Sequence, residues 1–292
     1  MKIGFLGLGL MGSAMVSRLQ DKGYDVTVLG NRNRAGLDAA VARGASEAST
    51  GREVAEASDI VMLCMGTSDH VEARMRGDDG IIAGLSDGKV VIDFGTSLPA
   101  STIALGAEAA AKGATMLDAP LGRTPAHAVD GLLNIMTAGD KDTFDRVKPV
   151  LDDLGENVFH LGKLGSGHTV KLLNNFFGMT QAQAMCEAFA VADLAGIPRK
   201  TIAEVIGAGP LRSGMMDFVA AYAVDGDPTK LEFSIANAGK DLRYYNEMVA
   251  SLGQDSRMGK GPKDVLAQAA EEGHGDEMVS QMVDSFARWF AD

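Results

Sequence analysis

Residues 4–12 read GFLGLGLMG and carry the pattern G-x-G-x-x-G at Gly7, Gly9 and Gly12. The pattern follows an apolar segment of strand character and precedes a helical one. In that context the first glycine permits a tight turn, the second lets the backbone approach a pyrophosphate, and the third lets helix and strand pack closely. The N–H groups at the helix N-terminus then face the anion. We therefore predict a dinucleotide site whose cofactor contacts come from Gly7, Leu8, Gly9, Leu10, Met11 and Gly12.

Working outward from this segment, the first half of the chain alternates strand and helix patterns, which indicates βαβ units and a mostly parallel sheet. Strands are expected at 2–6, 25–29, 45–48, 59–65, 89–93, 115–118, 133–138 and 157–161. Helices are expected at 11–22, 35–43, 51–57, 72–76, 101–112 and 142–154.

The pattern changes near residue 162, and Thr169–Leu194 reads as one long helix followed by further helices. The predicted fold class is an α/β Rossmann-type N-terminal domain with an all-α C-terminal domain, joined by this long helix. We expect a dinucleotide-binding domain at 1–162 and a substrate-binding and oligomerisation domain at 163–292.

Composition limits the classes of partner. The 292 residues carry a formal charge of −12, which argues against a nucleic-acid or anionic-membrane binder because both need a cationic surface. No apolar run approaches the length of a membrane span. Cys64 and Cys186 lie far apart and are expected to be buried, reduced thiols of a cytoplasmic protein. No cluster of His, Cys and carboxylates has ligand spacing, so no metal is expected.

The end of the second expected strand bears on the type of cofactor. NAD enzymes usually place an acid there for the ribose 2′-hydroxyl. This chain has Gly30-Asn31-Arg32-Asn33-Arg34 and no carboxylate between Asp25 and Asp38. Arg32 or Arg34 could pair with a 2′-phosphate, or both could be solvated loop charges. We therefore favour NADP over NAD and assign cofactor contact to Asn31 and Arg32.

Lys171 and Asn175 stand four residues apart in the long helical pattern, so they share one helix face. A partly desolvated lysine suits general acid/base chemistry, and an amide can hold a substrate hydroxyl. On spacing alone, a surface lysine is the favoured interpretation.

Four blocks of the chain resemble the β-hydroxyacid dehydrogenase family, the group of 3-hydroxyisobutyrate dehydrogenase and tartronate semialdehyde reductase. In order along the chain they are residues 4–15, Asp118-Ala119-Pro120 with its loop, residues 162–175, and Lys240-Asp241-Leu242. The resemblance covers essentially the whole chain. It implies the two-domain fold described above and a homodimer or homotetramer packed through the helical domain.

The resemblance also implies site roles. Lys171 would be the catalytic acid/base and Asn175 would orient substrate, with Asn174 beside it. Lys240 would lie by the cofactor and the substrate and help to position the substrate, and Thr96 would lie near the nicotinamide. Met65 is also expected at the cofactor. Because Lys171 fills the acid/base role, His127, His160 and His168 are expected to be structural or to line the site with polar groups.

The substrate loop departs from the usual Asp-Ala-Pro-Val-Ser-Gly-Gly. Here Asp118-Ala119-Pro120-Leu121 is followed by Gly122, Arg123 and Thr124, which adds a cation and a hydroxyl. A guanidinium suits a carboxylate or a larger oxyanion. The loop is similar to that of sulfolactaldehyde reductase, which suggests a three-carbon sulfonate substrate held by Gly122, Arg123 and Thr124. In the alternative, Arg123 pairs with a local acid such as Asp118 or Asp130.

Together these features predict an NAD(P)-dependent oxidoreductase that interconverts a small 3-hydroxy acid and its semialdehyde by hydride transfer, acting on a small anionic substrate. Within the family, 3-hydroxyisobutyrate, tartronate semialdehyde or succinic semialdehyde are alternative substrates. Imine reductases share the fold but usually lack the lysine. A non-catalytic dinucleotide-binding scaffold is the alternative from a different class.

Overall fold

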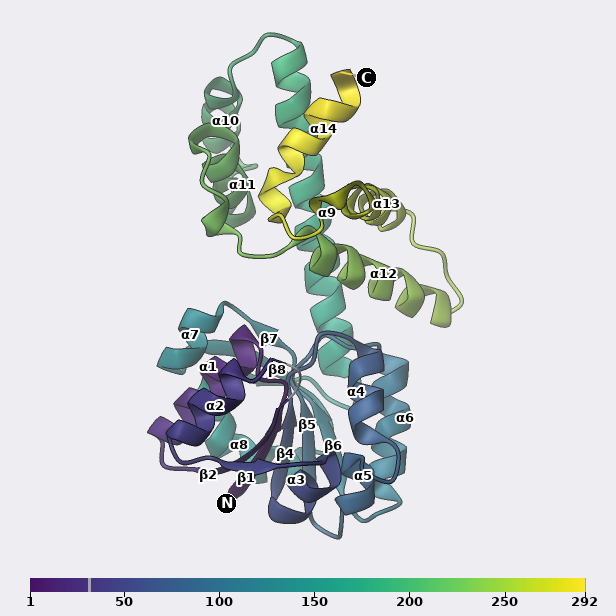
Figure 1. Ribbon diagram of the computed structural model, residues 1–292. Helices are drawn as coiled ribbons and strands as arrows, with labels where there is room; N and C mark the ends of the chain where they lie inside the picture. The colour runs from purple at the N-terminus through teal and green to yellow at the C-terminus, as the bar shows by residue number, and fades with distance from the viewer. Residues whose placement is uncertain (31–32, 292) are drawn as a thin grey trace. The chain divides into compact units, whose positions relative to one another are not determined.

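The computed structural model describes residues 1–30 and 33–291, which divide into two units, one ending at Lys171 and the other beginning at Leu172. The first unit is an α/β structure (Figure 1). Its elements are β1 (Lys2–Leu6), α1 (Leu10–Asp21), β2 (Asp25–Leu29), α2 (Ala35–Ala42), β3 (Ser46–Ala48), α3 (Gly51–Ala57), β4 (Ile60–Leu63), α4 (Ser68–Met75), α5 (Ile81–Gly84), β5 (Val90–Asp93), α6 (Pro99–Ala110), β6 (Thr115–Asp118), β7 (Leu121–Gly122), α7 (Pro125–Asp130), β8 (Leu133–Thr137), α8 (Lys141–Leu154) and β9 (Gly155–His160).

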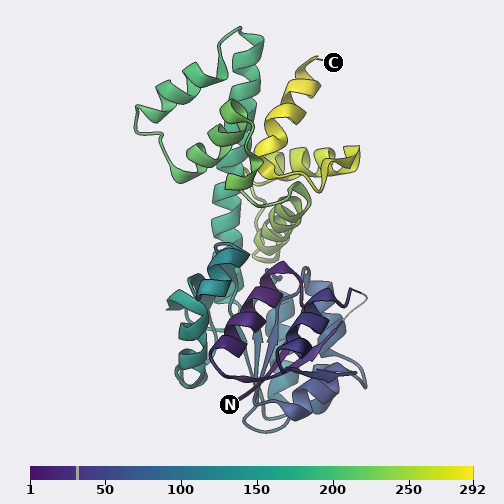
Figure 2. The same cartoon turned by 60° about the vertical axis from the view of Figure 1, so that its left-hand side comes forward.

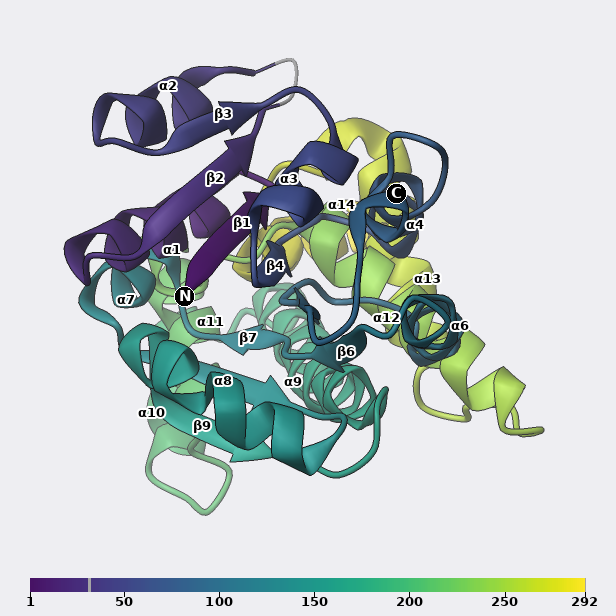
Figure 3. The same ribbon diagram turned by 90° about the horizontal axis from the view of Figure 1, so that it is seen from below.

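The main sheet has six parallel strands in the order β3-β2-β1-β4-β5-β6. Figure 3 shows β2, β1 and β4 side by side. This order is that of a doubly wound dinucleotide-binding sheet, in which ligands bind beyond the strand ends where the chain reverses direction across the sheet. The Rossmann-type fold expected from residues 4–12 is therefore confirmed for this unit.

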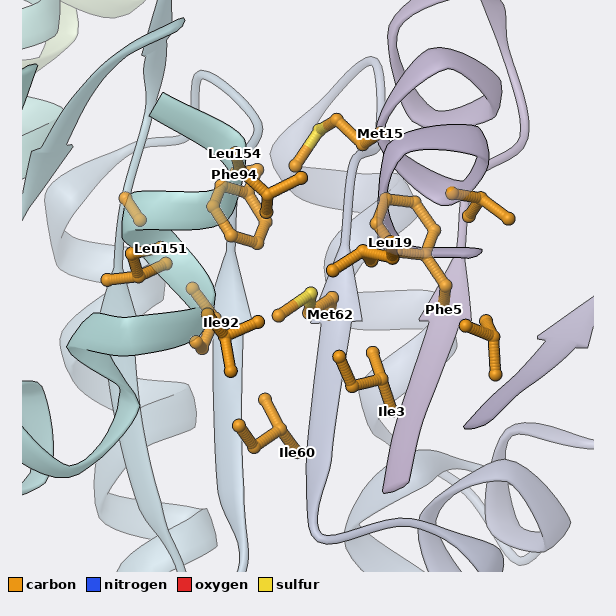
Figure 4. Packing of buried hydrophobic residues seen from close by; sticks show 14 of the residues in the cluster. Ile3, Phe5, Met15, Leu19, Ile60, Met62, Ile92, Phe94, Leu151 and Leu154 are labelled. Atoms are coloured by element: carbon orange, nitrogen blue, oxygen red, sulfur yellow. The ribbon is translucent and has the colours of Figure 1, made fainter. Parts of the chain in front are cut away.

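Alternation along each central strand sends side chains to two apolar layers. Figure 2 shows α1 and α2 beside each other over one face of the sheet. On that face Ile3, Phe5, Met62 and Ile92 pack against Met15 and Leu19 of α1 and Leu151 and Leu154 of α8 (Figure 4). The opposite face packs against α3, α4 and α6. Because both faces are covered, the strands are nearly continuous runs of Val, Ile, Leu and Met.

A second, three-stranded sheet holds the last strands of this unit, and it was not foreseen. β7 pairs antiparallel with β8, and β8 pairs parallel with β9. The sequence predicted β8 and β9 as further strands of the mostly parallel sheet. Hydrophobic periodicity identifies a strand but does not identify its neighbour. Here the chain leaves β6, reverses through Asp118–Pro120 and starts a separate ladder.

The second unit is helical. It contains most of α9 (Ser166–Leu194), followed by α10 (Arg199–Gly207), α11 (Gly214–Asp225), η1 (Pro228–Lys230), α12 (Ile235–Ser251), α13 (Lys260–Ala269), η2 (Ala270–His274), η3 (Val279–Gln281) and α14 (Met282–Ala291). No strand occurs among residues 172–291, which confirms the expected all-α region. Its core is built from Cys186 and Phe189 of α9 with residues of α11, α12, α13 and α14.

Candidate active site

The three glycines of the first turn have different steric reasons for being glycine. Gly7 has φ +99°, and a Cβ there would stand 2.2 Å from the carbonyl oxygen of Cys64. A Cβ at Gly12 would stand 1.9 Å from the carbonyl oxygen of Gly7, so α1 packs directly on the turn. A Cβ at Gly9 would meet nothing within 4 Å. Two glycines therefore serve packing within the protein, and Gly9 leaves open space at the end of β1.

Gly9 is also the N-cap of α1 and has no side chain with which to satisfy the first N–H groups of the helix. Leu10, the first helical residue, is 85% exposed. Open space, N–H donors and the positive end of a helix dipole together fit the pyrophosphate of a dinucleotide. Met65 borders the same turn, because its sulfur would lie 3.0 Å from a Cβ at Gly7.

The region that was expected to select the cofactor is described only in part. Asn31 and Arg32 lie outside the described residues. Arg34 forms ion pairs with Glu47 at 2.9 Å and with Asp38 at 3.1 Å. The hydrogen bonds that the Arg34 guanidinium donates to Glu47 raise the pKa of Arg34. Arg34 therefore already shares its charge with two carboxylates.

The turn after β5 contains Thr96, the residue expected near the nicotinamide. Asp93 shapes this turn, since its Oδ1 accepts the N–H of Gly95 at 2.8 Å and its Oδ2 accepts the hydroxyl of Ser97 at 2.7 Å. A Cβ on Gly95 would lie 3.0 Å from the carbonyl oxygen of Met65. The structure thus brings together Gly7, Met65 and the turn of Thr96, three of the expected cofactor positions.

In the substrate loop, residues 122–124, the side chains do not converge on one site. Arg123 has φ +78°, a left-handed conformation that favours glycine. Its guanidinium donates to the carbonyl oxygen of Leu132 at 2.6 Å and pairs with Glu156 at 2.5 Å. Thr124 instead contacts Nδ1 of His127 at 2.8 Å.

Arg123 therefore does pair with an acid, but neither Asp118 nor Asp130 is its partner. Glu156 belongs to β9, in the small sheet that the sequence did not predict. Its pairing with Arg123 depends on how β7, β8 and β9 are arranged, which no local pattern reveals.

Asp118, at the end of β6, holds the beginning of α9. Its Oδ1 accepts the N–H of Gly165 at 2.8 Å, and its Oδ2 accepts the N–H of His168 at 2.7 Å. Burial raises the pKa of Asp118, while the charge of His168 and these N–H donors act in the opposite direction. Lys171 lies one turn further along α9 and is half-buried.

In the second unit, Asn175 and Lys240 meet at a residue that the sequence reasoning did not single out. Nδ2 of Asn175 donates to Oδ2 of Asp241 at 2.6 Å, and Nζ of Lys240 lies 3.0 Å from Oδ1 of Asp241. Asn174 donates to Oδ1 of Asn175 at 3.1 Å. Asp241 is 2% exposed. Asp241 belongs to the block Lys240-Asp241-Leu242, so the signal in the sequence was an acid directly beside a lysine expected at the site.

Within residues 1–30 and 33–291 no group of three or more His, Cys, Asp and Glu side chains could hold a metal ion. In the same residues no helix is both long enough and apolar enough to cross a membrane.

Comparison with known proteins places this chain in a family context. Residues 2–162 match the model described as the NAD binding domain of 6-phosphogluconate dehydrogenase. Residues 165–286 match the NAD-binding model of NADP-dependent 3-hydroxyisobutyrate dehydrogenase.

Three relatives illustrate the similarity. The 2-(hydroxymethyl)glutarate dehydrogenase of Eubacterium barkeri is 31% identical over 91% of this chain and 93% of its own. The 3-sulfolactaldehyde reductase of Escherichia coli is 29% identical over 97% and 94%. The solved structure of Mycobacterium tuberculosis 3-hydroxyisobutyrate dehydrogenase with L-serine has a TM-score of 0.88 and 26% identity, covering 97% of this chain and 98% of that one.

Proposed function

The chain belongs to the β-hydroxyacid dehydrogenase family, and from this premise we propose that it interconverts a small 3-hydroxy acid and its semialdehyde with NAD(P). The observation that carries the proposal is the composition of α9, which has one lysine, no arginine and an asparagine four residues after that lysine. Lys171 follows the turn anchored by Asp118, and Asn175 is held by Asp241.

In the proposed reaction, a bound nicotinamide dinucleotide supplies hydride to the aldehyde carbon or accepts it from the alcohol. The ammonium of Lys171 donates a proton to the alkoxide oxygen as it forms, and the neutral amine takes that proton back during oxidation. The amide of Asn175 orients the same oxygen. Asp241 directs that amide, because one Nδ2–H of Asn175 donates to its carboxylate and leaves the second Nδ2–H to donate to that oxygen, while Oδ1 accepts from Asn174.

Lys171→Ala tests this proposal. We expect kcat to fall by about a thousandfold or more while the nicotinamide cofactor still binds, measured by turnover at 340 nm and by cofactor fluorescence titration. Lys171→Arg is a matched variant that keeps the charge but cannot release a proton near neutral pH, so it should also fail. Lys163→Ala, which removes an exposed lysine before α9, is the control. Substantial turnover in Lys171→Ala would exclude this mechanism, and absence of turnover in the unaltered protein would favour the scaffold alternative.

For the substrate, we propose a three-carbon sulfonate aldehyde held by Gly122, Arg123 and Thr124. The support is the cation that Arg123 adds to this loop, and the similarity to a relative named 3-sulfolactaldehyde reductase. The ion pair with Glu156 competes with this use of Arg123. Glu156→Gln should therefore raise kcat/KM for the sulfonate, and Arg123→Ala should lower it.

A substrate panel decides between anions. Oxidation of 2,3-dihydroxypropanesulfonate, 3-hydroxyisobutyrate, glycerate and 4-hydroxybutyrate would be compared with NADP and NAD in parallel. A hundredfold advantage for the sulfonate corresponds to about 2.7 kcal/mol of transition-state discrimination and would support the sulfonate assignment. A carboxylate advantage would make the Gly122-Arg123-Thr124 loop a variant carboxylate grip and would place the protein with the general 3-hydroxyacid dehydrogenases. The same assay tests our proposed preference for NADP.

We further propose that residues 1–162 bind the dinucleotide and that residues 163–292 bind substrate and form the oligomer. The protein would be a cytoplasmic homodimer or homotetramer. Large apolar side chains of α9 in the second unit are exposed at spacings that return to one helix face. They are Leu173 (46%), Phe177 (70%), Val191 (47%) and Leu194 (62%). Light scattering of the unaltered protein and of a Phe177→Glu variant tests whether this face joins copies of the chain.

A further inference from the structure

A buried imidazole lies between two buried carboxylates in the first unit. His168, Asp93 and Asp118 are each 0% exposed. Nε2 of His168 lies 3.7 Å from Oδ2 of Asp93, and Nδ1 lies 3.8 Å from Oδ2 of Asp118. Within the described part of the chain, Nε2 has no hydrogen-bond partner. Burying three ionisable groups is costly unless they compensate one another, so this cluster calls for a role beyond filling space.

Each carboxylate fixes a different segment of the candidate site. Asp93 and Asp118 are register partners at the ends of the neighbouring strands β5 and β6. Asp93 binds the turn of Gly95 and Ser97, which brackets Thr96. Asp118 binds the first N–H groups of α9, the helix of Lys171. The imidazole therefore lies between the carboxylate that anchors the turn of Thr96 and the carboxylate that anchors the start of α9.

Thr102 of α6 shares a hydrogen bond with the imidazole of His168. Oγ1 of Thr102 lies 2.8 Å from Nδ1 of His168 and 3.3 Å from the carbonyl oxygen of Leu98. Leu98 is the N-cap of α6 and ends the turn of Thr96. When the hydroxyl donates to Leu98, Nδ1–H of His168 donates to the hydroxyl. This chain of contacts ties the first turn of α9 to the turn after β5.

We propose that His168 is a positioning residue that holds Lys171 in register with the turn of Thr96. His168 and Lys171 are three residues apart, so they lie on adjacent turns of one helix face, and contacts that fix the first turn of α9 also fix where the Lys171 side chain begins. The importance of that register for turnover rests on the acid/base role proposed for Lys171. The grip on the anionic end of the substrate comes from other residues, so binding of substrate should be less sensitive than the chemical step.

The test uses four variants of the full chain. His168→Leu removes both ring nitrogens, whereas His168→Asn keeps an amide near the place of Nδ1 and can still pair with Thr102. Thr102→Val removes only the hydroxyl. Thr137→Val is the matched control, because Thr137 is also fully buried in this unit and its hydroxyl has no partner among the described residues. Steady-state kinetics is measured on folded protein, with the folded fraction determined by circular dichroism.

We expect kcat of His168→Leu to fall ten- to a hundredfold and that of Thr102→Val about threefold to tenfold, with KM for the hydroxy acid changed by less than threefold. His168→Asn should recover most of the lost kcat, and Thr137→Val should match the unaltered protein. A purely structural role would lower the folded fraction without this split between kcat and KM. Equal kcat values for His168→Leu and the unaltered protein, or equal losses for the Leu and Asn variants, would overturn the proposal.

Amide hydrogen exchange provides a reading that does not need turnover. His168→Leu should accelerate exchange both at the start of α9 and in the turn at residues 94–98, and His168→Asn should do so much less. If the unaltered protein turns over no hydroxy acid, the proposed function fails while this exchange experiment still tests the link. If His168→Leu does not fold, the exchange of Thr102→Val is the deciding measurement. Identical exchange in Thr102→Val and Thr137→Val would then contradict the proposed link between the start of α9 and the turn at residues 94–98.

Discussion

Asp118 in the first unit and Asp241 in the second are both buried carboxylates, and different kinds of donor satisfy them. Asp118 accepts the backbone N–H groups of Gly165 and His168. Asp241 accepts the side-chain amide of Asn175 and lies 3.0 Å from the ammonium of Lys240. Backbone donors exist because a helix begins there, whereas side-chain donors depend on the identity of two other residues.

The comparison separates two ways in which a fold can hold a site. Removing Asp118 leaves helix-terminal N–H groups buried and unsatisfied, so it should affect the folding of the first unit. Removing a side-chain donor of Asp241 leaves one lone pair of its carboxylate without a partner, so we expect a local effect on stability. The predictions below test this distinction, beginning with the largest expected effect.

Asp118→Ala should lower the free energy of unfolding by about 3–5 kcal/mol, because two buried N–H groups lose their acceptor at about 1–3 kcal/mol each. Urea unfolding followed by circular dichroism measures it. Asp130→Ala, an exposed acid at the end of α7, is the control and should change stability by less than about 0.5 kcal/mol. A loss below about 1 kcal/mol for Asp118→Ala would show that the N–H groups find other acceptors.

Gly167→Ala and Gly239→Ala should have opposite signs. A Cβ at Gly167 would stand 2.3 Å from the carbonyl oxygen of Met136 and 2.8 Å from Oδ2 of Asp118, so we expect a loss of about 2–3 kcal/mol. A Cβ at Gly239 in α12 would meet its nearest neighbour at 3.6 Å, and helix propensity predicts a gain of about 0.5–1 kcal/mol. Thermal unfolding of both variants checks the contrast, and a destabilised Gly239→Ala would contradict it.

Asn175→Ala should lower the free energy of unfolding by about 1–2 kcal/mol, because the buried Oδ2 of Asp241 loses its donor. Asn237→Ala, on an exposed position of α12, is the control. Unfolding by urea of the two variants gives the difference. A cost for Asn175→Ala as large as that of Asp118→Ala would remove the distinction between backbone and side-chain donors.

The smallest effect concerns a matched pair of tyrosines. Tyr24 donates to Asp153 at 2.8 Å in the first unit, and Tyr222 donates to Asp284 at 2.6 Å in the second. Burial, with the neighbouring carboxylate, raises the pKa of each phenol to about 12. A phenol whose folded pKa exceeds its ordinary value of about 10 stabilises the protein below pH 10, and this contribution is lost as the pH rises from 10 to 12.

Tyr24→Phe and Tyr222→Phe should therefore each weaken the decline of stability between pH 10 and pH 12. Thermal unfolding at pH 9, 10, 11 and 12 measures the decline. Here the two units should respond alike, because both tyrosines have side-chain acceptors. An undiminished alkaline decline in either variant would show that its phenol is not the group that titrates.

Much of the fold was predictable because the decisive signals are local. The glycine pattern, the buried strands and the change of period near residue 162 each lie in a few neighbouring residues, and the strand order and helical unit agree with them. The small β7-β8-β9 sheet was missed, since periodicity marks a strand without naming its partner. The assignment of Lys171 and Asn175 came from family resemblance, because their spacing alone was ambiguous.

Sequence alone was sufficient for the Rossmann-type class and the all-α second half, because both follow from backbone conformation and burial pattern over short windows. The pairing of Arg123 with Glu156, the place of His168 between Asp93 and Asp118, and the role of Asp241 with Asn175 required the three-dimensional structure. These contacts join residues 33 to 75 positions apart in the chain. Charge partners at such separations depend on which strands and helices become neighbours, and local propensity carries no information about that choice.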